Sequence, residues 1–222
     1  MSSSTVVGQQ QPQQSSTSSP AIGKVEEAAA AADSEERVDP GISAITDYLF
    51  LSGYDCLTEE AVRSVGVTCA VNCIKGMKKR HFSTDGRRID YYHIPLEDEE
   101  TQKLGDHMEK VARLIERQRQ QGGKTLVYCG LGISRSATLV IAYLMLQRRL
   151  PLREAYQFVQ RRRPIVCPNV GFFRQLIELE KRLFDNVTTV DIIEPARGVF
   201  VADVVWQEIY EEVAQKINRI KL

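Results

Sequence analysis

Hydrophobic and polar positions divide the chain into a polar beginning and a long patterned body. Residues 1–40 are rich in Ser, Gln, Pro and Ala and contain almost no large apolar side chains. Such a segment cannot bury enough apolar surface to offset the entropy lost on ordering, so we expect a disordered N-terminal tail. From Gly41 onward, short apolar runs alternate with segments whose apolar residues recur at helical spacing.

This pattern predicts an α/β fold. The apolar runs predict strands at 48–51, 67–74, 89–96 and 126–129. Helical spacing predicts helices at 58–65, with Thr58 as the cap, and at 104–115, 134–146, 152–162 and 169–184. Strands that alternate with helices favour a mostly parallel central sheet flanked by helices. Ligands of such sheets bind at the carboxyl ends of the strands.

Residues 186–222 continue the pattern, and we expect them to form a C-terminal extension that packs on the domain. Residues 187–193 and 198–205 are compatible with strands. A helical apolar stripe follows, which we expect to pack on the same domain, with an intermolecular contact as the alternative. The stripe consists of Trp206, Ile209, Tyr210, Val213, Ile217 and Ile220.

The segment 126–136, Leu-Val-Tyr-Cys-Gly-Leu-Gly-Ile-Ser-Arg-Ser, carries the clearest candidate chemistry. Cys129 ends a predicted strand, a loop with two glycines follows, and a predicted helix begins near Arg135. A strand, a tight loop and a helix N-terminus bring backbone N–H groups to one point, which binds anions and favours a nucleophilic thiolate. The guanidinium of Arg135 offers a planar fork for two phosphate oxygens. The Cys–Arg spacing alone is weak evidence, and a buried structural cysteine beside a surface arginine is the alternative.

Residues 127–145 resemble the phosphate-binding loop and following helix of the small atypical dual-specificity protein phosphatases, in the cysteine-based protein tyrosine phosphatase superfamily. The resemblance extends from about Gly41 to Phe184 and suggests a catalytic domain at 41–185. Further matching segments, in order along the chain, are 45–53, 71–73, 94–98, 163–164 and 168–172. The resemblance implies hydrolysis of phosphotyrosine and phosphoserine or phosphothreonine in proteins, through a cysteinyl-phosphate intermediate.

The resemblance also implies roles for individual residues. Cys129 would be the nucleophile, Arg135 would bind the phosphate, and Ser136 would hydrogen-bond the departing sulfur. Asp98 would be the general acid. The residues that would surround the phosphate are Gly130, Leu131, Gly132, Ile133, Ser134 and Arg135.

Two assignments leave alternatives open. Glu97, Glu99 and Glu100 compete with Asp98, and the whole cluster would also suit the start of the next helix. Asn169 resembles a family residue that braces the catalytic loop, but it is equally suited to be only the N-cap of the last helix.

One position departs from the family. Tyr128 stands before the nucleophile, where the family usually has a histidine that helps to keep the thiol ionised. A phenol is neutral near pH 7. We therefore expect an active but slow enzyme. A catalytically weak module that binds phosphoproteins, or a scaffold that acts through its termini, is the rival interpretation.

Other residues narrow the ligand class. Leu131 and Ile133 stand where phosphatases of inositol lipids usually carry lysines, which argues against polyphosphorylated lipids. The formal net charge is zero, so the sequence gives no argument for nucleic acid. No apolar run is long enough for a membrane span. The expected partners are thus phosphorylated proteins; the oligomeric state is not indicated.

The 5 cysteines show neither a disulfide framework nor a zinc-ligand spacing, which fits a reducing intracellular compartment, cytoplasm, nucleus or both. We expect no metal and no cofactor. Cys69 and Cys73 should be buried on one strand face. The basic runs 78–80 and 161–163 are expected to be solvated, with a place at the pocket rim as the alternative for the first. His93 and His107 are expected to be ordinary strand and helix residues.

Overall fold

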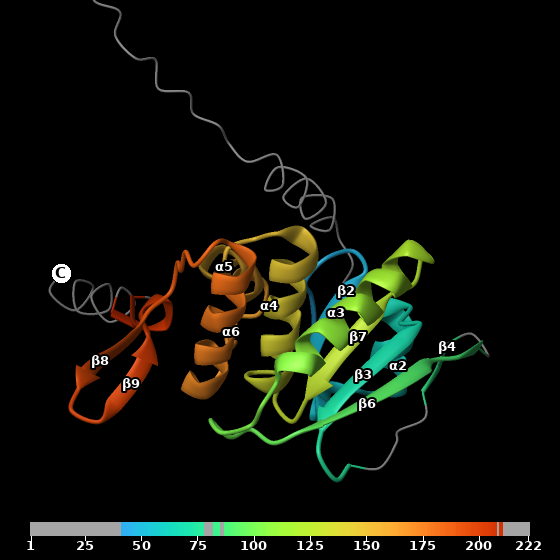
Figure 1. Ribbon diagram of the computed structural model, residues 1–222. Coiled ribbons are helices and arrows are strands. Elements are labelled where there is room, and N and C mark those ends of the chain that lie inside the picture. Colours follow the sequence, from blue (N-terminus) through green and yellow to red (C-terminus); the bar gives the residue numbers. More distant parts are fainter. Residues whose placement is uncertain (1–40, 78–81, 85–86, 208, 211–222) are drawn as a thin grey trace, which may run out of the picture.

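The computed structural model describes residues 41–77, 82–84, 87–207 and 209–210, and its centre is a five-stranded sheet (Figure 1). The strand order is β1-β2-β7-β3-β6. The edge strand β1 is antiparallel to β2, and the remaining neighbours are parallel. This confirms the predicted α/β fold with a mostly parallel sheet. The strands are β1 (Ile42–Ala44), β2 (Leu49–Gly53), β3 (Cys69–Ile74), β6 (Asp90–Leu96) and β7 (Thr125–Cys129).

The helices lie close to their predicted positions. They are α2 (Glu59–Val65), α3 (Gly105–Gln120), α4 (Arg135–Arg148), α5 (Leu152–Arg162) and α6 (Val170–Leu183). As predicted, α2 is capped by Thr58, whose side chain accepts a hydrogen bond from the Ala61 N–H. The smaller elements are the turn η2 (Tyr54–Cys56) and two hairpins, β4 (Ser83–Thr84) with β5 (Arg87–Arg88) and β8 (Ile192–Ala196) with β9 (Val199–Ala202).

The two faces of the sheet are buried in two separate cores. Successive side chains of a strand point to opposite faces, so Val127 and Cys129 join the larger core, which contains residues of α3, α4, α5 and α6. Leu126 and Tyr128 join the smaller core, which contains residues of α2. The catalytic-loop candidate therefore follows a central strand that is buried on both sides.

Helix α4 is the buried centre of the larger core. Every residue from Ser136 to Met145 is buried, because the sheet, α3, α5 and α6 surround this helix. This explains its almost uniformly apolar sequence, since no face meets water. Its first residue, Arg135, lies at the carboxyl end of the sheet beside Cys129. The buried helix α4 therefore holds this part of the candidate site in place.

A buried carboxylate helps to attach the C-terminal extension to the domain. Glu180 is 1% exposed and accepts hydrogen bonds from the Leu152 N–H and from both the N–H and the hydroxyl of Thr189. Thr189 is therefore bonded to the helices and not to a strand. This explains why β8 begins at Ile192, later than the strand predicted at 187–193.

The extension combines buried and exposed apolar residues. Val190, Ala202 and Val204 are buried in the larger core. In contrast, the side chains of Trp206, Ile209 and Tyr210 are exposed among the described residues, so this part of the predicted stripe is not buried. Val213, Ile217 and Ile220 lie outside the described residues. Within the described part of the chain, no helix has the length and apolar character needed to cross a bilayer.

Candidate active site

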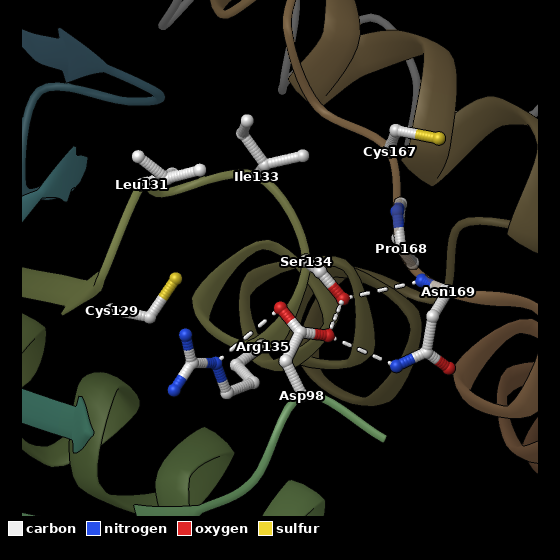
Figure 2. A pocket seen from close by; sticks show the side chains of 9 residues that line it. All are labelled: Asp98, Cys129, Leu131, Ile133, Ser134, Arg135, Cys167, Pro168 and Asn169. Atoms are coloured by element: carbon white, nitrogen blue, oxygen red, sulfur yellow. Dashed lines mark hydrogen bonds and ion pairs between the residues drawn. The ribbon is translucent and has the colours of Figure 1, made fainter. Parts of the chain in front are cut away.

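A pocket of about 300 Å³ opens where the carboxyl ends of β6 and β7 meet the starts of α4 and α6 (Figure 2). It brings together three segments that are far apart in sequence: the acidic loop after β6, the loop after β7, and the segment before α6. The lining residues are Asp98, Cys129, Leu131, Ile133, Ser134, Arg135, Cys167, Pro168 and Asn169. The other predicted site residues, Gly130, Gly132 and Ser136, belong to the same loop and helix start.

The Cys129 thiol lies at the base of this site and is 1% exposed. Its sulfur accepts a hydrogen bond from the Gly132 N–H at 3.2 Å and from the Ser136 hydroxyl at 3.1 Å. Hydrogen bonds donated to sulfur favour its charged form over the neutral thiol. The start of α4 adds the positive end of a helix dipole. These contacts suit a thiolate nucleophile.

The loop between Cys129 and α4 turns four consecutive carbonyl groups outward. Gly130 O accepts from the Tyr54 N–H at 2.8 Å, and Ile133 O accepts from the Cys167 N–H at 3.0 Å. Leu131 O and Gly132 O both accept from the Arg163 guanidinium at 2.9 Å. Every one of these carbonyls has a partner outside the loop. The backbone N–H groups between them therefore point toward the inside of the loop.

Gly132 is required by the shape of the loop. Its φ is +68°, a left-handed conformation that favours glycine. A Cβ atom at this position would lie 2.5 Å from the carbonyl carbon of Ser52. Glycine therefore allows the loop to pass directly over β2 while its N–H reaches the sulfur.

Asp98 is held against the loop by two hydrogen bonds and one ion pair. Its Oδ1 accepts from the Ser134 hydroxyl at 2.7 Å and from the Asn169 side-chain amide at 3.0 Å, and its Oδ2 lies 3.5 Å from Nε of Arg135 (Figure 2). Among the four acidic residues 97–100, only Asp98 lines the pocket. Glu97 pairs instead with Lys75, and Glu100 with Arg174.

Asn169 has both of the roles that the sequence left open. Its side-chain oxygen accepts from the Phe172 N–H at 2.9 Å, which caps α6. Its amide donates to Asp98, and its backbone N–H donates to the Ser134 hydroxyl at 3.2 Å. The residue therefore links the start of α6 to the acidic loop and to the loop after β7.

Arg135 has donors available for a ligand. Its Nη1 donates to the Leu96 carbonyl at a long 3.4 Å, and its buried Nε has no hydrogen bond within the described residues. Its side chain is 17% exposed and points along the pocket beside Cys129 (Figure 2). A planar guanidinium in this position matches two oxygens of a phosphate.

From the sequence, Arg163 was not expected in the site, because the whole 161–163 run was predicted to be solvated. The prediction is wrong for this residue, because Arg163 is 6% exposed and bonds the loop carbonyls. Charge runs are usually surface features, so composition hides a single buried member. The only signal was the Arg-Pro pair at 163–164 among the segments that resemble the family.

Tyr128 lies beside the site in sequence but faces the smaller core. Its side chain is fully buried, and its ring centre lies 6.5 Å from that of Tyr54. Burial, and then the neighbouring Tyr91, raises the pKa of Tyr128 well above its ordinary value. The phenol is therefore neutral at physiological pH, as expected from the sequence.

Those of the remaining candidates that the structure describes do not line the pocket. Cys69 and Cys73 are buried in the larger core, as predicted, and burial followed by the nearby Cys129 raises the pKa of Cys73 well above its usual value. The exposed imidazole of His93 contacts the Ile74 carbonyl. In the described ranges, no three His, Cys, Asp or Glu side chains cluster as metal ligands. Residues 78–80 lie outside those ranges.

Comparisons with known proteins agree on one family. The model for the dual specificity phosphatase catalytic domain matches residues 49–182. The chain is 38% identical to human dual specificity protein phosphatase 14, over 76% of this chain and 82% of that protein. An uncharacterized Caenorhabditis elegans protein is 40% identical over 80% of this chain, which spans only 58% of that relative.

Solved structures show the same relationship. Human DUSP28 superposes with a TM-score of 0.59 and 33% identity, over 67% of this chain and 99% of that one. A mouse dual specificity phosphatase complexed with zinc tungstate gives a TM-score of 0.60 and 31% identity, over 67% and 92%. The thiol, arginine and carboxylate of the pocket lie within the matched family domain. The chain therefore belongs to the dual specificity phosphatases, among the small atypical members of that family.

Proposed function

We propose that this dual specificity phosphatase removes phosphate from tyrosine and from serine or threonine of proteins through a phosphate ester of Cys129. One observation carries the proposal: a buried sulfur with two hydrogen-bond donors, a guanidinium with unused donors and a carboxylate line one pocket. Thiolate attack, oxyanion binding and proton transfer need these three groups.

In the first step, the Cys129 thiolate attacks phosphorus, and a P–S bond forms as the P–O bond to the substrate breaks. The Arg135 fork and the inward N–H groups of the loop hold the three remaining phosphate oxygens. Asp98, in its protonated form, gives its proton to the departing oxygen, so the product leaves as an alcohol or phenol.

In the second step, water attacks phosphorus and the P–S bond breaks. Asp98, now a carboxylate, takes the proton of that water, and inorganic phosphate forms. The electron pair of the broken bond returns to sulfur. The Ser136 hydroxyl, 3.1 Å from the sulfur, stabilises the thiolate as it leaves.

The pocket suits a phosphate monoester on a protein. Arg135 is the one cationic side chain among its lining residues, and Leu131 and Ile133 offer no charge for further phosphates. We expect the neutral Tyr128 to make the enzyme slow, because it supplies no positive charge near the thiol. We further propose that residues 41–185 form the catalytic unit, and that the protein acts in the cytoplasm, the nucleus or both.

One observation supports a second candidate function, that of a module that binds phosphoproteins without hydrolysing them. The described chain is similar to the human tyrosine phosphatase-like serine/threonine/tyrosine-interacting protein, with a TM-score of 0.57 and 28% identity over 64% of this chain. That protein is named as interacting with serine, threonine and tyrosine. The intact set of Cys129, Arg135, Ser136 and Asp98 favours the enzyme.

The two functions are separated by turnover of an aryl phosphate and of phosphopeptides by the purified full chain. The enzyme account predicts hydrolysis by the wild type, with activity lost in Cys129→Ser and strongly reduced in Asp98→Ala. Glu99→Ala, a neighbouring exposed acid outside the pocket, should retain full activity. Phosphopeptide binding without turnover by the wild type would establish the binding module instead.

A further inference from the structure

We propose that Arg163 is a positioning residue that holds the phosphate loop in its anion-binding shape and adds a buried positive charge beneath it. The inference rests on the proposed function, because it concerns the same loop. Arg163 lies at the end of α5 and does not line the pocket, so it would act entirely through the loop.

The direction of the loop N–H groups follows from its carbonyls. Across a trans peptide bond the C=O of one residue and the N–H of the next point in opposite directions. Arg163 fixes the carbonyls of Leu131 and Gly132 outward at 2.9 Å, so the N–H groups of Gly132 and Ile133 point inward. The Gly132 N–H does reach the Cys129 sulfur at 3.2 Å. One side chain thus orients two of the four peptides that would surround a phosphate.

The guanidinium is anchored on its other side as well. Its Nη1 donates to the Gly41 carbonyl at 3.2 Å and to the Ser43 hydroxyl at 3.1 Å. The four bonds use all three nitrogens of a rigid planar group. A lysine ammonium is a single point of charge on a flexible stem and cannot span these acceptors.

The charge of Arg163 is not neutralised by a carboxylate. Its hydrogen-bond acceptors are three carbonyl oxygens and one hydroxyl, and no acidic side chain pairs with it among the described residues. Burial lowers the pKa of Arg163, whereas the charges of Cys56 and Cys129 act in the opposite direction. An arginine stays protonated even so. The Arg163 guanidinium therefore places a positive charge without a carboxylate partner beneath the loop that would surround the phosphate.

The test compares Arg163→Lys and Arg163→Met with Arg161→Met, a matched loss of charge at an exposed position of the same run. Three quantities are measured on the full chain: the melting temperature, kcat/KM with p-nitrophenyl phosphate, and the affinity for sodium tungstate by calorimetry. We expect folded Arg163→Lys to lose both kcat/KM and tungstate affinity by roughly 10- to 100-fold, because a small misplacement of the loop is enough for such a loss. Arg161→Met should match the wild type in both.

The outcomes separate this inference from the proposed function. Wild-type tungstate affinity and turnover in a folded Arg163→Lys protein would overturn the role of Arg163 and leave the phosphatase account standing. A wild type without turnover would overturn the phosphatase account, and tungstate affinity would still test Arg163. If neither Arg163 variant folds, Ser43→Ala removes one acceptor and leaves the arginine in place. Weaker tungstate binding by Ser43→Ala would support the inference, and unchanged binding would overturn it.

Discussion

The side chains of Tyr128 and Cys129 lie on opposite faces of the central sheet, although the two residues are neighbours in the chain. Cys129 belongs to the core around α4, and Tyr128 to the core around α2. The phenol therefore does not touch the sulfur or line the pocket. A side chain at position 128 influences the thiol only through its charge across the strand and through the position of the loop.

Tyr128→His should increase kcat/KM with an aryl phosphate by about 3- to 10-fold, because an imidazolium across the strand favours the thiolate. Burial lowers the pKa of a histidine, so the imidazolium should form mainly below pH 7. The gain in kcat/KM should therefore grow as the pH falls. Initial rates between pH 5.5 and 7.5 measure this. Tyr128→Phe, which removes the hydroxyl without adding charge, should leave the rate unchanged. No gain for the histidine variant, or a loss, would contradict the proposal that Tyr128 makes the enzyme slow.

Replacements of Asn169 should separate its two functions. Serine is as good an N-cap as asparagine, so Asn169→Ser should keep α6 capped but lose the amide that donates to Asp98. We expect its melting temperature to stay near that of the wild type and its kcat to fall roughly tenfold or more. Asn169→Ala should lose about 1 kcal/mol of stability as well. Full activity of Asn169→Ser would show that Asn169 acts only as a helix cap.

Ser136→Ala should slow the second chemical step more than the first. The hydroxyl donates to the sulfur at 3.1 Å, and this stabilisation matters most when the thiolate is the leaving group. Stopped-flow hydrolysis of p-nitrophenyl phosphate should show a rapid burst of nitrophenol followed by a slow steady state. Ser136→Thr, which retains a hydroxyl, is the control. A reduced rate without any burst would place the effect of Ser136 in the first step.

The two loop glycines should respond differently to alanine. Gly132→Ala combines a left-handed backbone with a Cβ 2.5 Å from the Ser52 carbonyl carbon, so we expect a loss of at least about 1–3 kcal/mol in stability together with activity. At Gly130 the nearest atom to an added Cβ is Nη2 of Arg135 at 3.2 Å, the tip of a flexible side chain. Gly130→Ala should therefore fold normally and lose activity only. Thermal denaturation and kcat/KM of the two proteins test this, and equal stabilities would contradict the role assigned to Gly132.

Local signals in the sequence predicted the elements well. Thr58 caps the helix that it was expected to cap, Asn169 caps α6, which was one of its two expected roles, and α5 has the predicted limits. Short-range hydrogen bonds of this kind depend on residues three or four positions apart. The strand expected at 187–193 begins later, because Thr189 bonds Glu180 and Arg153, which are close only in the folded chain.

The site was predictable where one segment contains the chemistry, and less so where distant segments meet. Cys129, Gly132, Arg135 and Ser136 form one continuous loop and helix start. Arg163 carries no local sign of burial, since its partners lie on a loop about thirty residues earlier and at the start of the domain. The choice of Asp98 among four acidic neighbours depended on the family resemblance, and its contacts with Ser134 and Asn169 support the choice.

The proposed mechanism depends on a phosphate ester of Cys129, and rapid acid quench of Asp98→Ala with p-nitrophenyl phosphate would detect it. Nitrophenol leaves without help from an acid, but the second step lacks its base, so the phosphoenzyme should accumulate. Peptide mass spectrometry should find phosphate on Cys129, and Cys129→Ser should show none at this position under the same conditions. Release of inorganic phosphate without a phosphorylated enzyme, or phosphate on a different residue, would contradict the mechanism.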